Sequence, residues 1–249
     1  MTSFKEQLRQ GRPLLGLWQA LASGYSAEIC ARQGFDWLLL DGQHSPNSIG
    51  TLQAQASAAF PVEPIVRVPC GEPVVIKQYL DLGLHTLLVP MVETAEHARE
   101  LVRACRYPPH GIRGVSSATS RGADFGLDAD YLHTASERIT LIVQIESRKG
   151  LENLPAIAEV EGVDALFIGP SDLAASLGHI GEPLHPEVTA AIDQARAAIA
   201  AAGKPAGIFA VSPEHARQAI ADGFAFVSVG TDIGLLISGA RQVLQAVRG

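Results

Sequence analysis

Leu141-Ile-Val-Gln-Ile-Glu146, followed by Leu166-Phe-Ile-Gly-Pro-Ser-Asp172, is the stretch that decides the fold of this chain. Each segment is a short apolar run that ends in a carboxylate, and the two carboxylates stand about one strand–helix repeat apart. Because neighbouring strands of a parallel barrel end on one face, Glu146 and Asp172 are expected to meet there. Two convergent carboxylates without Cys or His ligands indicate a hard divalent cation that keeps several waters.

Eight apolar runs have the composition of strands buried on both faces, since they are short, continuous and rich in Val, Ile, Leu and Phe. They are expected at Leu14–Trp18, Trp37–Asp41, Pro64–Val68, Thr86–Pro90, Thr140–Ile145, Ala165–Ile168, Ala206–Phe209 and Phe226–Val229. Amphipathic helical patterns lie between most of them, clearest at Pro73–Leu82, Thr94–Arg106, Pro186–Ala202 and Pro213–Asp222. This alternation in 249 residues predicts an α/β fold, one single-domain (β/α)8 barrel over residues 1–249. An open doubly wound sheet is the alternative, but no Gly-x-Gly-x-x-Gly follows the first strand.

The composition excludes several classes of protein. A chain that is 47% hydrophobic and 18% charged is globular and not disordered. Its net charge of −7, without a Lys/Arg block, argues against nucleic acid and against an anionic membrane as partners. No signal-peptide core is present, and no apolar stretch reaches the ~18–20 residues that span a bilayer. Cys30, Cys70 and Cys105 form no metal or disulfide spacing, so reduced thiols in a cytoplasmic protein are expected.

One segment interrupts the alternation of strands and helices. Residues Tyr107 to Asp130, between the fourth and fifth strands, are rich in Gly, Pro and Ser. Loops of this length in compact domains are usually functional or interfacial. We expect this segment to fold over the mouth of the barrel or to reach a neighbouring subunit.

Polar residues gather at the carboxyl ends of the expected strands, where barrel enzymes place their active sites. They are Trp18, Gln19, Asp41, Gln43, His44, Arg67, Gln144, Glu146, Ser171 and Asp172. His44 has the titration range of a general base, although a loop histidine that bonds the backbone is the alternative. Arg67 lies inside an apolar run and would suit an oxyanion or a carboxylate. Its alternative is a structural salt bridge, to Asp41 or Glu63.

Three further observations bear on the chemistry. The alternative to a cation site at Glu146 and Asp172 is a pair of strand-end caps, since Gly169-Pro-Ser-Asp172 is also a helix-start signal. No lysine lies inside a late strand, and Lys204 precedes the seventh strand at the wrong end, which favours a metal-assisted mechanism over an imine mechanism. Asp81, near the end of its helix, has by itself the pattern of a surface carboxylate.

Longer motifs resemble the HpcH/HpaI family of class II, metal-dependent pyruvate aldolases, and the resemblance covers nearly the whole chain. The motifs are Phe35-Asp-Trp-Leu-Leu-Leu-Asp-Gly-Gln-His-Ser-Pro-Asn47, Pro73-Val-Val-Ile-Lys-Gln-Tyr-Leu-Asp-Leu-Gly83, Arg106-Tyr-Pro-Pro-His-Gly-Ile-Arg-Gly-Val115, Val143-Gln-Ile-Glu-Ser147 and Val160-Glu-Gly-Val-Asp-Ala-Leu-Phe-Ile-Gly-Pro-Ser-Asp-Leu173. The family includes aldolases for 4-hydroxy-2-oxoheptanedioate, 5-keto-4-deoxy-D-glucarate and 2-keto-3-deoxy-L-rhamnonate. The resemblance implies a (β/α)8 barrel, a homo-hexamer built as a dimer of trimers, and a last helix, here Asp232–Arg248, exchanged between neighbours.

The resemblance also implies roles for the matching positions. Glu146 and Asp172 match metal ligands, and Gln144 and Ser171 match contacts to the pyruvyl portion of the substrate. Trp18 and Asp172 are further expected to contact the substrate. His44 matches the catalytic base, Asp81 the carboxylate that raises the pKa of that base, and Arg67 the group that stabilises the enolate. The cofactor implied is Mg²⁺, Mn²⁺ or Co²⁺, with no organic cofactor. Gln43 departs from the family's usual Asp-Gly-Glu-His, which removes one negative charge beside the metal.

These residues and the resemblance predict reversible retro-aldol cleavage of a 4-hydroxy-2-oxo acid to pyruvate, or hydroxypyruvate, plus an aldehyde. The nearest alternative is an acyl-CoA lyase of the citramalyl or malyl type, but the chain lacks the length and basic surface expected for a CoA tail. A second alternative is a non-catalytic barrel that binds 2-keto acids. It would bind pyruvate without exchanging its protons.

Overall fold

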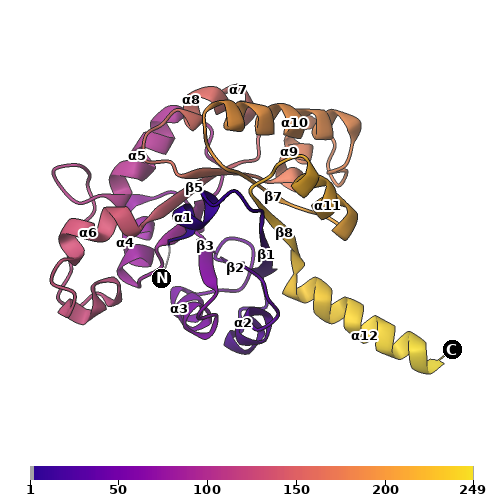
Figure 1. The fold of residues 1–249 in the computed structure, drawn as a ribbon, viewed down its shortest axis with the longest axis horizontal. Helices are drawn as coiled ribbons and strands as arrows, with labels where there is room; N and C mark the ends of the chain where they lie inside the picture. The colour runs from indigo at the N-terminus through magenta and orange to yellow at the C-terminus, as the bar shows by residue number, and fades with distance from the viewer. Residues whose placement is uncertain (1–2, 249) are drawn as a thin grey trace.

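The computed structural model describes residues 3–248, and within them eight parallel strands close into a barrel in the order of the sequence (Figure 1). The strands are β1 (Leu14–Gln19), β2 (Trp37–Asp41), β3 (Glu63–Arg67), β4 (Thr86–Val89), β5 (Thr140–Ile145), β6 (Ala165–Ile168), β7 (Ala206–Phe209) and β8 (Phe226–Thr231). The predicted barrel is confirmed. Every expected strand is present to within two residues, and the pairing of β1 with β8 closes the ring.

Most of the helices surround the barrel on its outer side, whereas α12 extends away from it (Figure 1). Their bounds are α1 (Phe4–Leu8), α2 (Gly24–Ala31), α3 (Ile49–Ala58), α4 (Pro73–Asp81), α5 (Ala95–Cys105), α6 (Tyr131–Arg138), α7 (Arg148–Glu152), α8 (Leu154–Ala158), α9 (Pro170–Leu177), α10 (Pro186–Ala201), α11 (Pro213–Ala221) and α12 (Asp232–Arg248). A short 3-10 helix covers Arg121–Gly126. Within residues 3–248, no helix has the length and apolar character needed to cross a membrane.

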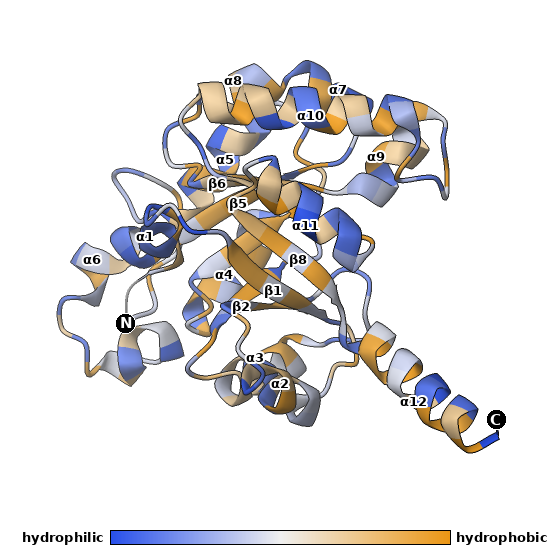
Figure 2. Ribbon diagram, turned by 45° about the vertical axis from the view of Figure 1, so that its right-hand side comes forward, coloured by the Kyte–Doolittle hydropathy of each residue, from blue (hydrophilic) through white to orange (hydrophobic). Residues whose placement is uncertain are grey.

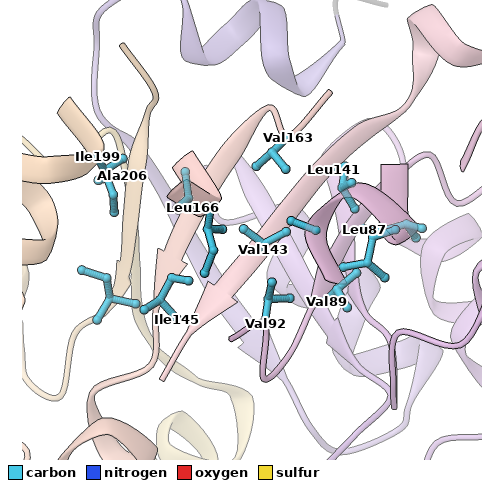
Figure 3. Packing of buried hydrophobic residues seen from close by; sticks show 14 of the residues in the cluster. Leu87, Val89, Val92, Leu141, Val143, Ile145, Val163, Leu166, Ile199 and Ala206 are labelled. Carbon is cyan, nitrogen blue, oxygen red and sulfur yellow. The ribbon is translucent and has the colours of Figure 1, made fainter. Parts of the chain in front are cut away.

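The buried side chains form two layers, one inside the barrel and one between the strands and the helices. Figure 3 shows part of the outer layer, with Leu87, Val143 and Leu166 on neighbouring strands. Inside the barrel, aromatic rings fill the amino-terminal half, where Phe4 of α1 meets Phe226 edge-on at 5.7 Å between ring centroids. These side chains therefore fill the barrel interior in its amino-terminal half.

Tight packing in the barrel requires glycine at particular strand positions. A Cβ added at Gly16 would lie 2.0 Å from the Trp37 ring, and one at Gly207 would lie 2.4 Å from Phe226. Contacts below 3.0 Å are not tolerated by real Cβ atoms. These two glycines therefore leave the space that the aromatic rings occupy.

The segment from Tyr107 to Asp130 packs beside α4 and α6, at the left of Figure 1. Its anchor is Arg113, which is 1% exposed, donates to Asp81 at 2.8 Å and lies over the rings of Tyr107 and Tyr131. The expectation that this segment folds over the barrel mouth is wrong, and its alternative, a contact with a neighbouring subunit, stays a prediction. A buried Arg113 without an anionic partner would be unfavourable, so the segment lies where Arg113 can pair with Asp81 at the end of α4.

Candidate active site

The carboxyl ends of the strands enclose a cavity of about 290 Å³. It is lined by Trp18, Ala20, Asp41, His44, Arg67, Gln144, Phe167, Gly169, Pro170, Ser171, Asp172, Phe209 and Thr231. Seven of these side chains were expected from the sequence as polar strand-end residues. Three others that were expected are not among its lining residues: Gln19, Gln43, and Glu146, which accepts a hydrogen bond from the lining residue Gln144. The predicted convergence of strand ends is therefore real.

Asp41 is the structural centre of one side of this cavity. It is 2% exposed and accepts both Nε of Arg67, at 3.0 Å, and Nη2 of Arg67, at 2.6 Å. Its carboxylate also accepts the backbone N–H groups of Gln43 and His44 and the indole N–H of Trp18, at 2.9, 3.2 and 3.1 Å. Burial acts to raise the pKa of Asp41, but the Arg67 pair and the other donors bring that pKa below its usual value. Asp41 is therefore a fixed anion.

Arg67 is held in one orientation by two different partners. The Asp41 carboxylate takes one edge of the guanidinium in a bidentate pair, and the Trp18 ring lies 4.7 Å from Cζ. Arg67 is 6% exposed, so the pair is formed largely out of water. The salt bridge to Asp41, which was the alternative for Arg67, is therefore confirmed. The part of the guanidinium that does not contact Asp41 lies along the cavity. A buried, oriented positive charge of this kind suits an oxyanion.

Glu146 and Asp172 meet on the other side, as the spacing predicted. Glu146 is 2% exposed; its Oε1 accepts the backbone N–H of Met91 at 2.8 Å and its Oε2 accepts Nε2 of Gln144 at 2.6 Å. Burial, together with the negative charge of Asp172, raises the pKa of Glu146 to about 7, while the Met91 N–H and Arg67 act in the opposite direction. The two carboxylates repel, and no cationic side chain in residues 3–248 pairs with either of them.

Glycines let the backbone approach these groups closely. A Cβ at Gly169 would lie 2.6 Å from Oε2 of Glu146 and 2.8 Å from Nε2 of Gln144. A Cβ at Gly42 would lie 2.7 Å from the carbonyl oxygen of Arg67, which accepts the Gly42 N–H at 2.8 Å. Gly169 is also the N-cap residue of α9, so Ser171 and Asp172 reach the cavity from the first turn of that helix.

The donor set fits a hard divalent cation. Glu146 and Asp172 offer carboxylate oxygens, and the buried amide oxygen of Gln144 has no hydrogen-bond partner among the described residues. Arg67 forms its ion pair with Asp41, so neither Glu146 nor Asp172 has a cationic ion-pair partner among the described residues. Oxygen-only donors with excess negative charge are what Mg²⁺ and Mn²⁺ prefer.

His44 is exposed at the rim of the cavity and its backbone N–H is tied to Asp41. The structure does not bring Asp81 to it. Helix α4 runs antiparallel to the strands, so Asp81 at its end lies next to the start of β4, at the opposite end of the barrel, where it pairs with Arg113. The carboxylate that contacts the His44 segment in this chain is Asp41.

Gln43 also differs from expectation. It lines a separate cavity with Cys70, Met91 and His97, and its buried Oε1 has no partner within residues 3–248. The negative charge that a glutamate at position 43 would carry is therefore not on the wall of the cavity beside Glu146 and Asp172.

Some site residues carried no sequence signal. The backbone N–H of Met91, which holds Glu146, can be contributed by any residue type, although Met91 itself has a positive φ of 54°. Phe167 and Phe209 form the apolar wall beside Trp18, at 5.9 and 5.4 Å between ring centroids. The one sequence signal for Phe167 and Phe209 was their place at inward-facing positions, which alternate with outward-facing positions along a strand.

Comparison with known proteins identifies close relatives. A family model described as HpcH/HpaI aldolase/citrate lyase matches residues 14–239. A hydroxypyruvate/pyruvate aldolase from Deinococcus radiodurans is 57% identical over 241 residues, which cover 96% of this chain and 87% of that protein. A 4-hydroxy-2-oxo-heptane-1,7-dioate aldolase from Shigella sonnei is 52% identical over 240 residues, covering 96% and 92%. The crystal structure of an HpcH/HpaI aldolase/citrate lyase family protein from Burkholderia cenocepacia J2315 has a TM-score of 0.97 and 43% identity, covering 100% of both chains.

Proposed function

This chain belongs to the HpcH/HpaI aldolase/citrate lyase family and is a carbon–carbon lyase of the aldolase type, and we propose that it uses a divalent cation to cleave a 4-hydroxy-2-oxo acid reversibly to pyruvate, or hydroxypyruvate, and an aldehyde. The observation that carries the proposal is the Glu146–Asp172 carboxylate pair, which has no ion-pair partner among the described residues, beside a cavity lined by Asp172 and by the oriented guanidinium of Arg67. The two relatives named above act, by their names, on substrates of these two kinds.

Each residue of the site has a distinct part in this mechanism. Glu146 and Asp172 would hold Mg²⁺, Mn²⁺ or Co²⁺, which when bound supplies Lewis-acid stabilisation of the carbonyl chemistry. Gln144 and Ser171 contact the pyruvyl portion of the substrate, and Trp18 lies beside it with the apolar wall that excludes water. A residue at the rim, His44, takes the proton from the 4-hydroxyl group as the C3–C4 bond breaks.

Arg67 stabilises the charge that develops in that step. The electron pair of the breaking bond moves toward the former keto oxygen, and a fixed positive charge there needs no reorganisation during the reaction. Asp41 and the Trp18 ring supply the fixation, because they hold the guanidinium from two directions. Asp41 is thus a positioning residue for Arg67.

The experiment that tests the proposal follows pyruvate release from 4-hydroxy-2-oxo acids by a coupled lactate dehydrogenase assay. Metal-stripped protein and Glu146→Gln are expected to lose activity, and Mg²⁺ or Mn²⁺ is expected to restore only the unsubstituted protein. The matched control is Glu152→Gln, which changes an exposed carboxylate of α7. Full turnover without metal, or in Glu146→Gln, would contradict the proposal. Activity on acyl-CoA thioesters alone would favour a lyase of the malyl type.

We also propose a homo-hexamer, a dimer of trimers, in which α12 packs on a neighbouring subunit. Helix α12 extends away from the barrel (Figures 1 and 2). It exposes a row of large apolar side chains. Leu236, Val243 and Val247 are 63, 67 and 81% exposed. An apolar helix face of this size is stabilised only by burial against a partner. Leu236→Asp with Val243→Asp should lower the mass measured by light scattering, and Gln242→Asp on the same helix should not.

A reducing compartment suits the cysteines of this chain. Cys30 and Cys105 are buried, Cys70 is exposed, and all three are free. Disulfides are rare in the cytosol and common in secreted proteins. We therefore propose the cytoplasm as the location.

A further inference from the structure

A second cavity lies at the opposite end of the barrel from Glu146 and Asp172. Its volume is about 600 Å³, and it is bounded by α1, by α10 and by the loops that lead into β6, β7 and β8. Its charged lining residues are Lys5, Arg9, Asp164, Arg196 and Lys204. The aromatic layer that includes Phe4 and Phe226 lies in the barrel interior between the two ends. The cavity is therefore separate from the site already described.

The charge of this cavity is opposite to that of the chain as a whole. The protein carries a net charge of −7, yet four cationic side chains and one carboxylate line the cavity among the described residues. The carboxylate, Asp164, is partly engaged, because its Oδ2 accepts the backbone N–H of Leu141 at 2.9 Å. A fifth cation, Arg106, is close by, since a Cβ at Gly162 would meet its Nη2 at 2.7 Å. Cationic side chains therefore outnumber carboxylates in and beside this cavity, which favours an anion there.

Several donors in this cavity are unused. Nε of Arg196 is buried and has no hydrogen-bond partner among the described residues. Arg9 and Arg196 form no ion pair within residues 3–248. Lys5 and Lys204 each donate to one backbone carbonyl, of Ile139 and Val163 respectively, and an ammonium group has three donors. The cavity therefore has more hydrogen-bond donors than acceptors. This is unfavourable, because a buried donor without an acceptor is costly.

Capping of helix ends accounts for only part of this cluster. Lysines near the carboxyl ends of helices commonly bond exposed carbonyls and complement the helix dipole. This explains Lys5, whose acceptor Ile139 follows α6, but it gives no acceptor for the guanidinium of Arg196. Like charges that share a cavity repel one another, and an anion placed among them would remove that repulsion.

We propose that this cavity binds a small dianion, held by Arg9, Arg196 and Lys204 through phosphoryl or carboxylate oxygens. Its volume suits a metabolite and not a polymer. Guanidinium groups bind such oxygens in bidentate fashion, and the remaining N–H groups of Lys204 add a point charge. The ligand reaches the cavity from the amino-terminal end of the barrel, so it binds without entering the catalytic cavity.

Isothermal titration calorimetry on the metal-free protein tests this directly. Inorganic phosphate and succinate are the two probes, each titrated at an ionic strength held constant with NaCl, and their comparison separates a phosphoryl from a dicarboxylate preference. We expect one site per chain. Arg9→Gln with Arg196→Gln should weaken binding at least tenfold, whereas Arg217→Gln, an exposed arginine of α11 paired with Glu214, should leave it unchanged.

Three outcomes would overturn the proposal: no binding of either probe, equal binding in the double variant, or equal weakening in Arg217→Gln. Because Arg9 is exposed, Arg9→Gln alone provides a folded variant should the double substitution unfold the chain. The titration is repeated in Arg67→Ala, because Arg67 is the guanidinium that lines the catalytic cavity. Binding that disappears there belongs to the catalytic cavity and also overturns the proposal, whereas binding that persists stands whether or not the aldolase proposal holds.

Discussion

Asp41 shows at the scale of single residues how much of the site the sequence contained. Its place at the end of a buried strand identified it as a member of a polar cluster, and Arg67 was recognised as needing a partner. The sequence could not show that one carboxylate would receive Arg67, Trp18 and two backbone amides at once, because that depends on the register of β1, β2 and β3. Contacts between strands are a property of pairing, not of spacing along the chain.

Arg67 is predicted to act mainly on turnover. Arg67→Ala should lower kcat by roughly 10²–10³-fold, the loss typical of removing one preorganised oxyanion donor, with a smaller change in KM. Steady-state kinetics with a 4-hydroxy-2-oxo acid provides the measurement. Arg67→Lys should recover only part of the loss, since a lysine keeps the charge but not the fork that Asp41 holds. An Arg67→Ala protein with unaltered turnover would refute the assignment.

Gly169 is predicted to be required by the Glu146 carboxylate. Gly169→Ala would place a methyl group 2.6 Å from Oε2 of Glu146, so that carboxylate or the backbone of α9 must shift. We expect the affinity for Mn²⁺, measured by calorimetry, to fall at least tenfold, which is about 1.4 kcal/mol. The control is Gly50→Ala in α3, where the added Cβ would have only a 3.8 Å contact with Ser48. Equal affinities in the two variants would mean that Glu146 does not hold the metal.

Elements were easier to foresee than the segments that join them. The strands at Thr140–Ile145 and Ala165–Ile168 coincide with expectation, because short apolar runs buried on both faces have few alternatives. The Tyr107–Asp130 segment was misplaced, since its path follows the buried ion pair of Arg113 with Asp81, two residues far apart in sequence. The resemblance placed Asp81 beside His44, but the direction of α4 puts the two at opposite ends of the barrel within one chain.

The junction of β8 and α12 is predicted to depend on Asp232. This carboxylate is 4% exposed and accepts the backbone N–H groups of Ala20 and Leu21 and the hydroxyl of Ser26. Asp232→Ala should destabilise the protein by about 1 kcal/mol, because it leaves partly buried donors without their acceptor. Urea unfolding gives the measurement, and Asp222→Ala, at the end of α11, is the control with one exposed partner. Equal effects of the two changes would argue against this anchoring.

At the scale of the whole molecule, His85 gives the fold a specific response to acid. Burial, and then the charges of Arg113, Arg138 and Arg121, lower the pKa of His85 to about 4. Between pH 6.5 and pH 4 the unfolded chain takes up a proton that the folded chain does not, so stability is retained above pH 6.5 and falls as the pH is lowered. The shift corresponds to roughly 3 kcal/mol at most.

Urea unfolding at pH 7 and pH 4.5 checks this prediction. His85→Gln should lose less stability on acidification than the unsubstituted protein. The exposed His133→Gln is the control and should follow the unsubstituted protein. If the pH dependence is the same in all three proteins, His85 does not contribute to acid sensitivity.

The whole barrel brings two charged cavities to its two ends, an acidic one at Glu146 and Asp172 and a basic one at Arg196 and Lys204. The first cavity could be predicted from the sequence because its residues directly follow strands. The second could not, because Arg9 follows a helix near the start of the chain, whereas Arg196 lies in a late helix and Lys204 in a loop.

Deuterium uptake into the methyl group of pyruvate, followed by NMR in D₂O, tests the central claim most directly, because enolisation precedes any choice of aldehyde. Metal-stripped protein should show no exchange, and Mg²⁺ or Mn²⁺ should start it. The exchange should be lost in Glu146→Gln and in His44→Ala. Exchange without metal would contradict the role of the Glu146–Asp172 pair, and no exchange with any divalent cation would contradict the assignment of a pyruvate aldolase.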